Sequence, residues 1–400
     1  MPINLELPRK LNALASSAHL AAENMLRPIS RKYDLAEHAY PKELDMLAAA
    51  MEGRDEGSSG IKAGAMAKNS SDSDENSNGA NMGTVVGIEE MCWGDVGLLL
   101  TMPRAGLGNA ALSAVANDEQ KARFKGKWAA MAITEPSTGS DSASISTTAT
   151  PDGDHYVLNG EKIYITAGKR ADLIVVWATV DKSLGRAAIK SFAVEWGTEG
   201  MELARLEHKL GIKASDTAAV NFINCRVHKD NLLGNPEIDT KKSFAGVMQT
   251  FDNTRPMVAA MGLGVARAAL ERTRELLVDN VNLDYKLPLY SCSAVEAELY
   301  KMEAELESAR LLTLKSAWMA DNRKPNSMEA SMAKAKAGRV GSYVTLKCVE
   351  LCGSVGFCED ELLEKWARDS KIIDIFEGTQ QIQQLIVARR LLGLSSSELK

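Results

Sequence analysis

A single glutamate stands between two apolar stretches near the C-terminal end of the chain. In "KIIDIFEGTQQIQQLIVAR", residues 371–389, isoleucines and a phenylalanine precede Glu377, and apolar residues recur at helical spacing after it. Burying a carboxylate among apolar side chains is costly, and it raises the basicity of the group. Such a carboxylate can act as a general base if it is within reach of a proton and shielded from water. The alternative is a helix-capping or salt-bridged glutamate, which is the commoner fate of a lone Glu.

The composition limits what the rest of the chain can be. With 400 residues, 45% apolar and 25% charged, the sequence is typical of a soluble globular protein of two or three domains. The net charge of −6 offers no basic footprint for nucleic acid, and no apolar run reaches membrane-spanning length. The N-terminal residues do not resemble a secretory signal. Six cysteines without a CxxC pair predict reduced thiols and no metal site, so we expect a cytoplasmic protein.

The elements that must position Glu377 fall into three parts. Residues 1–127 repeat apolar positions at helical spacing, apart from a stretch at 53–81 whose Gly, Ser, Asn and Asp content predicts a flexible loop. Residues 128–237 contain short β-rich segments separated by turn signals, which predicts a small antiparallel β-domain. Residues 238–400 form long amphipathic segments typical of a helical bundle. The predicted fold class is α+β, mostly helical.

Five blocks of the sequence resemble, in order and at sensible spacing, the acyl-CoA dehydrogenase family. They are "AITEPSTGSDSAS" (132–144), "NGEKIYITAG" (159–168), "VNFINCRVHKDNLLG" (220–234), "FDNTRPMVAA" (251–260) and "IFEGTQQIQ" (375–383). The resemblance covers roughly residues 83–393. It implies an N-terminal helical domain, a central β-domain and a C-terminal four-helix bundle, in agreement with the pattern above.

The resemblance also implies a reaction, the FAD-dependent α,β-desaturation of an acyl-CoA thioester. Glu377 would take the α-proton, and Gly378 would let the backbone approach the thioester because it has no side chain. The family has a second location for the base, on the helix near residues 251–256, but no glutamate stands there in this chain. Asp252 and Arg255 resemble residues that bind CoA or line the mouth of the site. Their alternative role is in the first turn of a helix that includes Pro256.

Further positions are implied to bind the cofactor, FAD. Thr134 and Thr166 would contact the flavin ring, Ser140 would lie where the flavin phosphate meets CoA, and Tyr164 would supply an aromatic face. Short hydroxyl side chains suit this task because they give directional hydrogen bonds without charge. The full predicted cofactor set is Met131, Ile133, Thr134, Gly139, Ser140, Tyr164, Ile165, Thr166, Thr379 and Gln381. The predicted substrate set is Ser140, Asp252, Arg255 and Gly378.

The chain departs from the family where a neighbouring subunit usually contacts FAD. Asn282 and Lys286 lie in a segment that lacks the usual arginine, and Glu350 and Ser354 replace a glutamine and a glycine. An acid near a diphosphate is unfavourable. Arg104, near the expected floor of the acyl pocket, is a further candidate for substrate contact, although an arginine there is more often solvated or paired.

Two functions of different kinds are therefore open. The first is an active acyl-CoA dehydrogenase of fatty acid metabolism, a homotetramer or other homo-oligomer that passes electrons to an electron-transferring flavoprotein. The second is a non-catalytic or half-site subunit of a hetero-oligomer. The presence of Glu377, Thr134 and Thr166 favours the first.

Overall fold

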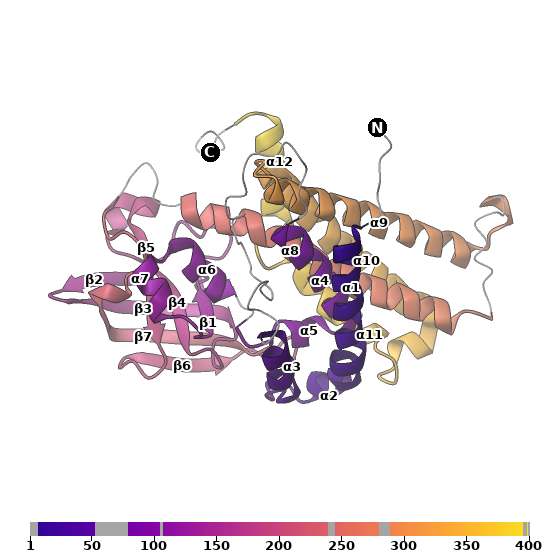
Figure 1. The fold of residues 1–400 in the computed structure, drawn as a ribbon, viewed down its shortest axis with the longest axis horizontal. Coiled ribbons are helices and arrows are strands. Elements are labelled where there is room, and N and C mark those ends of the chain that lie inside the picture. Colours follow the sequence, from indigo (N-terminus) through magenta and orange to yellow (C-terminus); the bar gives the residue numbers. More distant parts are fainter. Residues whose placement is uncertain are drawn as a thin grey trace.

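The computed structural model describes residues 7–52, 79–104, 107–238, 245–279, 289–394 and 398. Helices precede and follow one sheet, and Figure 1 shows the sheet at one end of the molecule, beside long helices that run away from it. The predicted fold class is confirmed. The domain limits predicted at residues 127 and 237 both fall between elements of the structure.

The N-terminal helices divide between the two halves of the molecule. They are α1 (Arg9–Ala21), α2 (Ser30–Leu35), α3 (Glu43–Glu52), α4 (Ala80–Gly94), α5 (Val96–Leu99), α6 (Leu107–Val115) and α7 (Asp118–Arg123). Of these, α4 packs on the C-terminal helices, whereas α6 packs on the sheet (Figure 1). The Asp321 carboxylate, from a distant helix, accepts the backbone N–H groups of Gly79, Asn81 and Met82 and so caps α4. The C-terminal limit predicted for the flexible loop 53–81 is wrong, because Ala80 and Asn81 already belong to α4. Residues 53–78 lie outside the described residues, so the rest of the loop stays a prediction.

Within the described residues, seven strands form one curved sheet. They are β1 (Ala129–Ala132), β2 (Thr148–Asp152), β3 (His155–Thr166), β4 (Leu173–Thr179), β5 (Ile189–Glu195), β6 (Met201–Leu206) and β7 (Thr217–His228). Most neighbours are antiparallel, as predicted, but β4 runs parallel to both β1 and β2, so the sheet is mixed. Strand β4 is buried at every position, which fits its run of branched apolar residues. The parallel pairs could not be read from turn signals, because their connections are long.

The C-terminal helices pack with the N-terminal helices around the largest apolar core of the described residues. The C-terminal helices are α8 (Ala245–Leu276), α9 (Ala294–Asp321), α10 (Ser327–Phe357), α11 (Leu363–Ser370) and α12 (Gln380–Leu391), and Figure 1 shows α8, α9 and α10 as the longest rods. Because α8 begins at Ala245, Pro256 lies inside this helix, and the prediction of a first turn at Asp252–Pro256 is wrong. Proline inside a helix removes one hydrogen bond; packing of the buried residues that follow, such as Val258 and Ala259, compensates for it.

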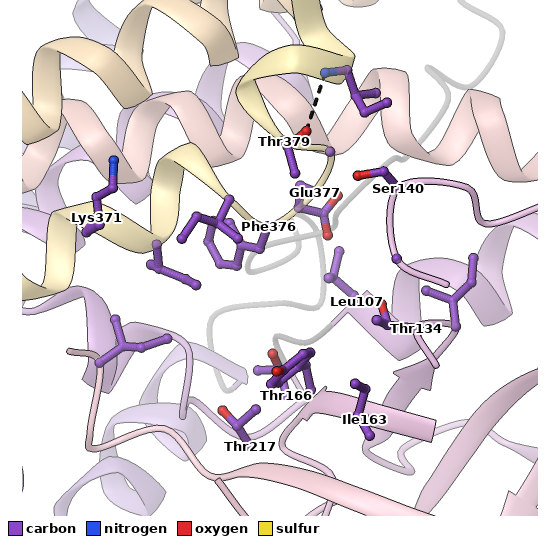
Figure 2. Close-up of a pocket in the computed structure, with 18 of the residues that line it drawn as sticks. Leu107, Thr134, Ser140, Ile163, Thr166, Thr217, Lys371, Phe376, Glu377 and Thr379 are labelled. Atoms are coloured by element: carbon purple, nitrogen blue, oxygen red, sulfur yellow. Dashed lines mark hydrogen bonds between the residues drawn. The ribbon is translucent and has the colours of Figure 1, made fainter. Parts of the chain in front are cut away.

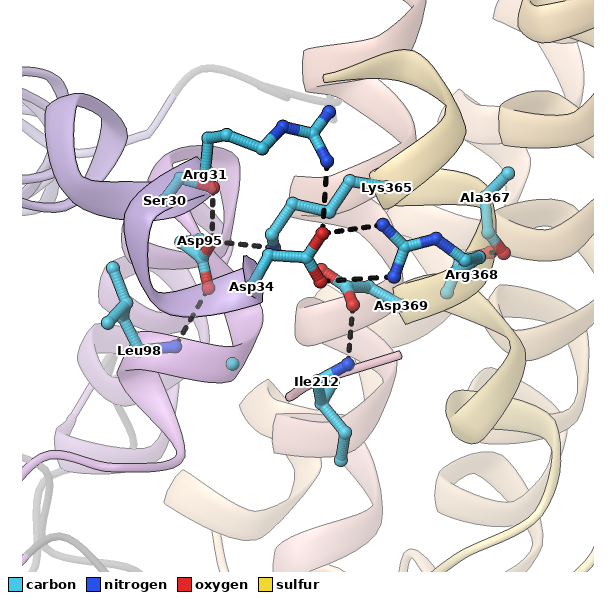
Figure 3. A network of polar contacts seen from close by, with 12 residues as sticks. Ser30, Arg31, Asp34, Asp95, Leu98, Ile212, Lys365, Ala367, Arg368 and Asp369 are labelled. Carbon is cyan, nitrogen blue, oxygen red and sulfur yellow. Dashed lines mark hydrogen bonds and ion pairs between the residues drawn. The ribbon is translucent and has the colours of Figure 1, made fainter. Parts of the chain in front are cut away.

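A fully buried lysine joins three separate regions of the chain (Figure 3). The Lys365 ammonium, on α11, lies 2.7 Å from an oxygen of Asp95, the residue before α5, and 2.5 Å from an oxygen of Asp369. The other oxygen of Asp369 accepts the backbone N–H of Ile212, from the segment between β6 and β7, at 2.5 Å. Burial lowers the pKa of Lys365, but the two aspartates raise it above its usual value. The cluster therefore holds the N-terminal helices, α11 and a loop of the β-domain at one point.

None of the helices in the described part of the chain has both the length and the apolar character that a membrane crossing requires.

The Lys365 cluster leads to a prediction about stability. Lys365→Met should lower the free energy of unfolding by about 3–5 kcal/mol, because it leaves two buried carboxylates without their cation. Chemical denaturation followed by circular dichroism would measure the change. The control is Lys32→Met, whose ammonium pairs with Glu43 on the surface and should matter little. A Lys365→Met protein as stable as the wild type would contradict the prediction.

Candidate active site

A cavity of about 710 Å³ lies between the sheet and the C-terminal helices. One wall is formed by the end of β1, the loop after it and β3; the other is formed by Arg255 of α8, the loop that contains Glu377, and α12. Figure 2 shows Glu377 and Phe376 on the helical side, facing Thr134, Ile163, Thr166 and Thr217 on the sheet side. A largely apolar cavity of this size with a few polar groups is typical of a small-molecule site.

The sheet-side wall is held by a second buried ion pair. Lys162, on β3, is fully buried, and its ammonium donates to a Glu135 carboxylate oxygen at 2.8 Å and to the Ile133 carbonyl at 3.1 Å. Glu135 also accepts the backbone N–H groups of Ser146 and Thr147. Burial raises the pKa of Glu135, but these hydrogen bonds outweigh it and lower the pKa to about 2. The ion pair therefore joins the two ends of the loop that carries Thr134, Gly139 and Ser140, and so fixes the position of this loop.

Two hydroxyl groups on this wall are available to a ligand. Thr134 and Thr166 line the cavity, and neither hydroxyl forms a side-chain hydrogen bond within the described part of the chain. Beside them, a bulge in β3 puts Tyr164 in the left-handed region, with φ of 56°, and leaves its side chain exposed. Aromatic and hydroxyl groups along one rim of an apolar cavity fit a planar heterocycle with polar edges, such as a flavin ring.

The helix-side wall presents Glu377. Its side chain is half-buried, because the carboxylate faces the cavity while protein encloses the rest. Thr254 of α8 donates its hydroxyl to Glu377 Oε2 at 2.9 Å. Burial raises the pKa of Glu377, whereas the Thr254 hydrogen bond and the positive charges of Arg255 and Lys334 oppose the rise without cancelling it. A carboxylate with a raised pKa in a shielded cavity is a chemically competent base.

The structure brings most of the predicted site residues to this cavity. The predicted residues that line it are Met131, Ile133, Thr134, Gly139, Ser140, Tyr164, Thr166, Arg255, Glu377, Gly378 and Thr379. Thr379 also caps α12 through its hydroxyl. Gathering at one cavity does not test the individual roles, which stay predictions.

Other predicted residues lie elsewhere. Ile165 is buried in the core of the sheet, and Gln381 is on the exposed face of the first turn of α12. Arg104 is not among the described residues that line the cavity. The side chain of Asp252 lies outside what the structure describes.

The predicted contacts with a neighbouring subunit lie away from this cavity or outside the described residues. Asn282 and Lys286 lie outside the described residues. Glu350 and Ser354 are exposed on α10, and the Glu350 carboxylate pairs with Lys347 at 2.6 Å. Whether these positions face a second subunit stays a prediction.

Sequence reasoning missed two buried residues behind Glu377. They are Lys334 on α10 and Gln383 on α12, both fully buried. A signal for Lys334 was present, because it shares a helix face with Ala330, Ala337 and Gly341, small residues that indicate close packing. A lysine on such a face needs a partner in the interior.

Comparison with known proteins agrees with this geometry. Residues 130–225 match the family model of the acyl-CoA dehydrogenase middle domain, and residues 244–392 match that of the C-terminal domain. A short-chain specific acyl-CoA dehydrogenase of Bos taurus mitochondria is 40% identical over 266 residues, which are 66% of this chain and 63% of the bovine protein. The chain thus spans less than two thirds of the length of that relative.

Two further proteins are similar over more of their length. A short-chain specific acyl-CoA dehydrogenase of Clostridium acetobutylicum is 33% identical over 315 residues, 77% of this chain and 81% of that protein. The butyryl-CoA dehydrogenase structure from Megasphaera elsdenii has a TM-score of 0.83 at 29% identity and covers 98% of this chain and 100% of its own. The chain therefore belongs to the acyl-CoA dehydrogenase family.

Proposed function

We propose that the chain is an FAD-dependent acyl-CoA dehydrogenase that introduces an α,β double bond into an acyl-CoA thioester. The observation that carries the proposal is the Glu377 carboxylate, which faces across a shielded cavity toward the hydroxyl-bearing side chains of Thr134 and Thr166. Family membership supports the flavin, and the residues of the sheet-side wall fit it. The names of the relatives, short-chain and butyryl-CoA dehydrogenases, support a short acyl group as substrate.

The proposed chemistry divides between the two walls of the cavity. Glu377 removes the proton from the α-carbon, and its raised pKa matches it better to that weakly acidic C–H group. A bound flavin supplies the acceptor for the hydride that leaves the β-carbon. Thr134, Thr166 and Tyr164 would hold the ring, while the apolar side chains of Ile375 and Phe376 exclude water from the base. After the proton transfer Glu377 is neutral, a form that its apolar surroundings tolerate.

The proposed partners follow from the family resemblance. An electron-transferring flavoprotein would reoxidise the enzyme, and the functional form would be a homo-oligomer. The alternative, a half-site subunit completed by a different chain, is favoured by one observation, the acidic Glu350 where the family has a neutral residue.

The base assignment predicts the behaviour of Glu377→Gln. This variant should bind FAD normally but lose about 10²–10⁴-fold in kcat on short acyl-CoA substrates, because an amide cannot accept the α-proton. Steady-state assays with an artificial electron acceptor and the flavin absorbance would measure both. The control is Glu361→Gln, a carboxylate held by Arg272 outside the cavity, which should retain turnover. Near-normal turnover by Glu377→Gln would show that another group is the base.

The pKa of Glu377 predicts a pH dependence. Because the base must be ionised, kcat/KM should fall as the pH drops through a pKa above the usual range of glutamate. Thr254→Val removes a hydrogen bond to the charged form, so this limb should move to higher pH by about one unit. Thr254→Ser keeps the hydroxyl and should leave the limb in place. A limb that moves to lower pH in Thr254→Val would contradict the assignment.

The homo-oligomeric enzyme and the half-site subunit should differ in flavin content. A homo-oligomeric enzyme should co-purify with FAD, and the flavin should be released when the oligomer is diluted to monomers. Light scattering combined with flavin absorbance would give the flavin content per chain at each mass. A monomer saturated with flavin would contradict a site shared between subunits, and an oligomer that stays inactive with added FAD would favour the half-site alternative.

A further inference from the structure

The backbone around Glu377 adopts a conformation that two consecutive residues rarely share. Glu377 has φ of 56° and Gly378 has φ of 91°, so both are in the left-handed region. The conformation costs glycine little, but it strains a residue with a longer side chain, and such strain persists when surrounding contacts impose it. Two buried side chains, Gln383 and Lys334, donate hydrogen bonds to the carbonyl groups of this segment.

Gln383 binds both carbonyl groups of the strained segment. Its side-chain Nε2 donates to the carbonyl oxygens of Glu377 and Gly378, each at 3.0 Å, and the side chain is fully buried. The fit is close, because a Cβ atom on Gly378 would lie 2.5 Å from Gln383 Nε2. The amide therefore fills the inner side of the turn that presents the Glu377 side chain to the cavity.

Lys334 reaches the same turn from the opposite helix. Its ammonium donates to the Gly378 carbonyl oxygen at 2.6 Å, and no carboxylate of the described chain lies within 4.0 Å of it. Burial lowers the pKa of Lys334 to about 8, although Asp374 and Glu377 act against the change. A buried ammonium is costly, so its presence behind the base, with a backbone oxygen as its hydrogen-bond partner, calls for a role.

We propose that Lys334 and Gln383 are positioning residues, which hold the Glu377–Gly378 peptide units in the left-handed conformation and so aim the Glu377 carboxylate at the reacting carbon. The proposal rests on the proposed role of Glu377 as the base. Lys334 extends from α10 and Gln383 from α12, so the turn is held from two helices at once. Neither side chain is among the residues that line the cavity, so neither is expected to touch substrate.

The test compares single variants in two backgrounds. In the wild-type background, Lys334→Met and Gln383→Leu should each lower kcat by about tenfold to a hundredfold, because a displaced base loses its alignment with the α-proton. KM and flavin content should change less than about twofold, since neither residue touches a ligand. The control is Lys336→Met on the same helix, which removes the partly exposed pair with Glu305 and should leave kcat unchanged.

The second background moves the base from the turn to helix α8. Thr254 Oγ1 lies 2.9 Å from Glu377 Oε2, so a glutamate at position 254 can place its carboxylate near the same point. In Thr254→Glu/Glu377→Gly, the base no longer depends on the turn, and adding Lys334→Met should change kcat less than about twofold. A merely structural role of Lys334 would lower kcat equally in both backgrounds, and that result would overturn the proposal.

The remaining outcomes are also decisive. Unchanged kcat in both Lys334→Met and Gln383→Leu would overturn the proposal, as would a fall confined to flavin content. If Lys334→Met does not fold, Gln383→Leu carries the same comparison; if the relocated base gives no turnover, the contrast between kcat and KM in the wild-type background decides. A different result would show that the proposed function itself is wrong: Glu377→Gln would then keep its turnover, whatever the effect of Lys334→Met.

Discussion

The arrangement of this molecule depends on one buried charge, the ammonium of Lys365. A lysine without solvent needs anionic partners at short range, and here they are Asp95 and Asp369. Because Asp95 caps the N-terminus of α5 and Asp369 also binds the backbone of Ile212, three regions must meet at the same point. Ile212 belongs to the wall of the cavity. The ion pairs of Lys365, which does not itself line the cavity, therefore fix the position of Ile212, which does.

A buried lysine also lies behind each of the two walls of the cavity. On the sheet side, the Lys162–Glu135 ion pair fixes the loop after β1, which carries Thr134, a residue expected to contact a flavin. On the helical side, Lys334 and Gln383 hold the strained turn that presents Glu377. Each wall is thus stabilised by a buried lysine behind its functional groups. Rigid support of this kind lets an apolar cavity keep a few polar groups at defined positions, which catalysis by a positioned base requires.

Sequence reasoning predicted the fold class, and most of the site residues that it singled out line the cavity. Glu377, Thr134 and Thr166, which were singled out because they lie in ordered motifs, line the cavity, and their roles stay predictions. Sequence reasoning was wrong about the helix start near Pro256, because packing along α8 outweighs the local preference of proline. It predicted an antiparallel domain, which holds for most strand pairs, but β4 pairs in parallel with β1 and β2. Strand direction depends on long connections, which turn signals do not report.

The sequence by itself determined the local features of this protein: helices with apolar faces, short buried strands, and a glutamate in an apolar setting before the last helix. These follow from periodicity and from residue preferences over a few positions. Only the tertiary structure decided which charges meet in the interior. Lys365 and Asp95 are separated by 270 positions, and Lys334 and Gly378 by 44. Such pairs form because a buried charge without a partner is costly. This cost arises only when the chain has folded around the charge.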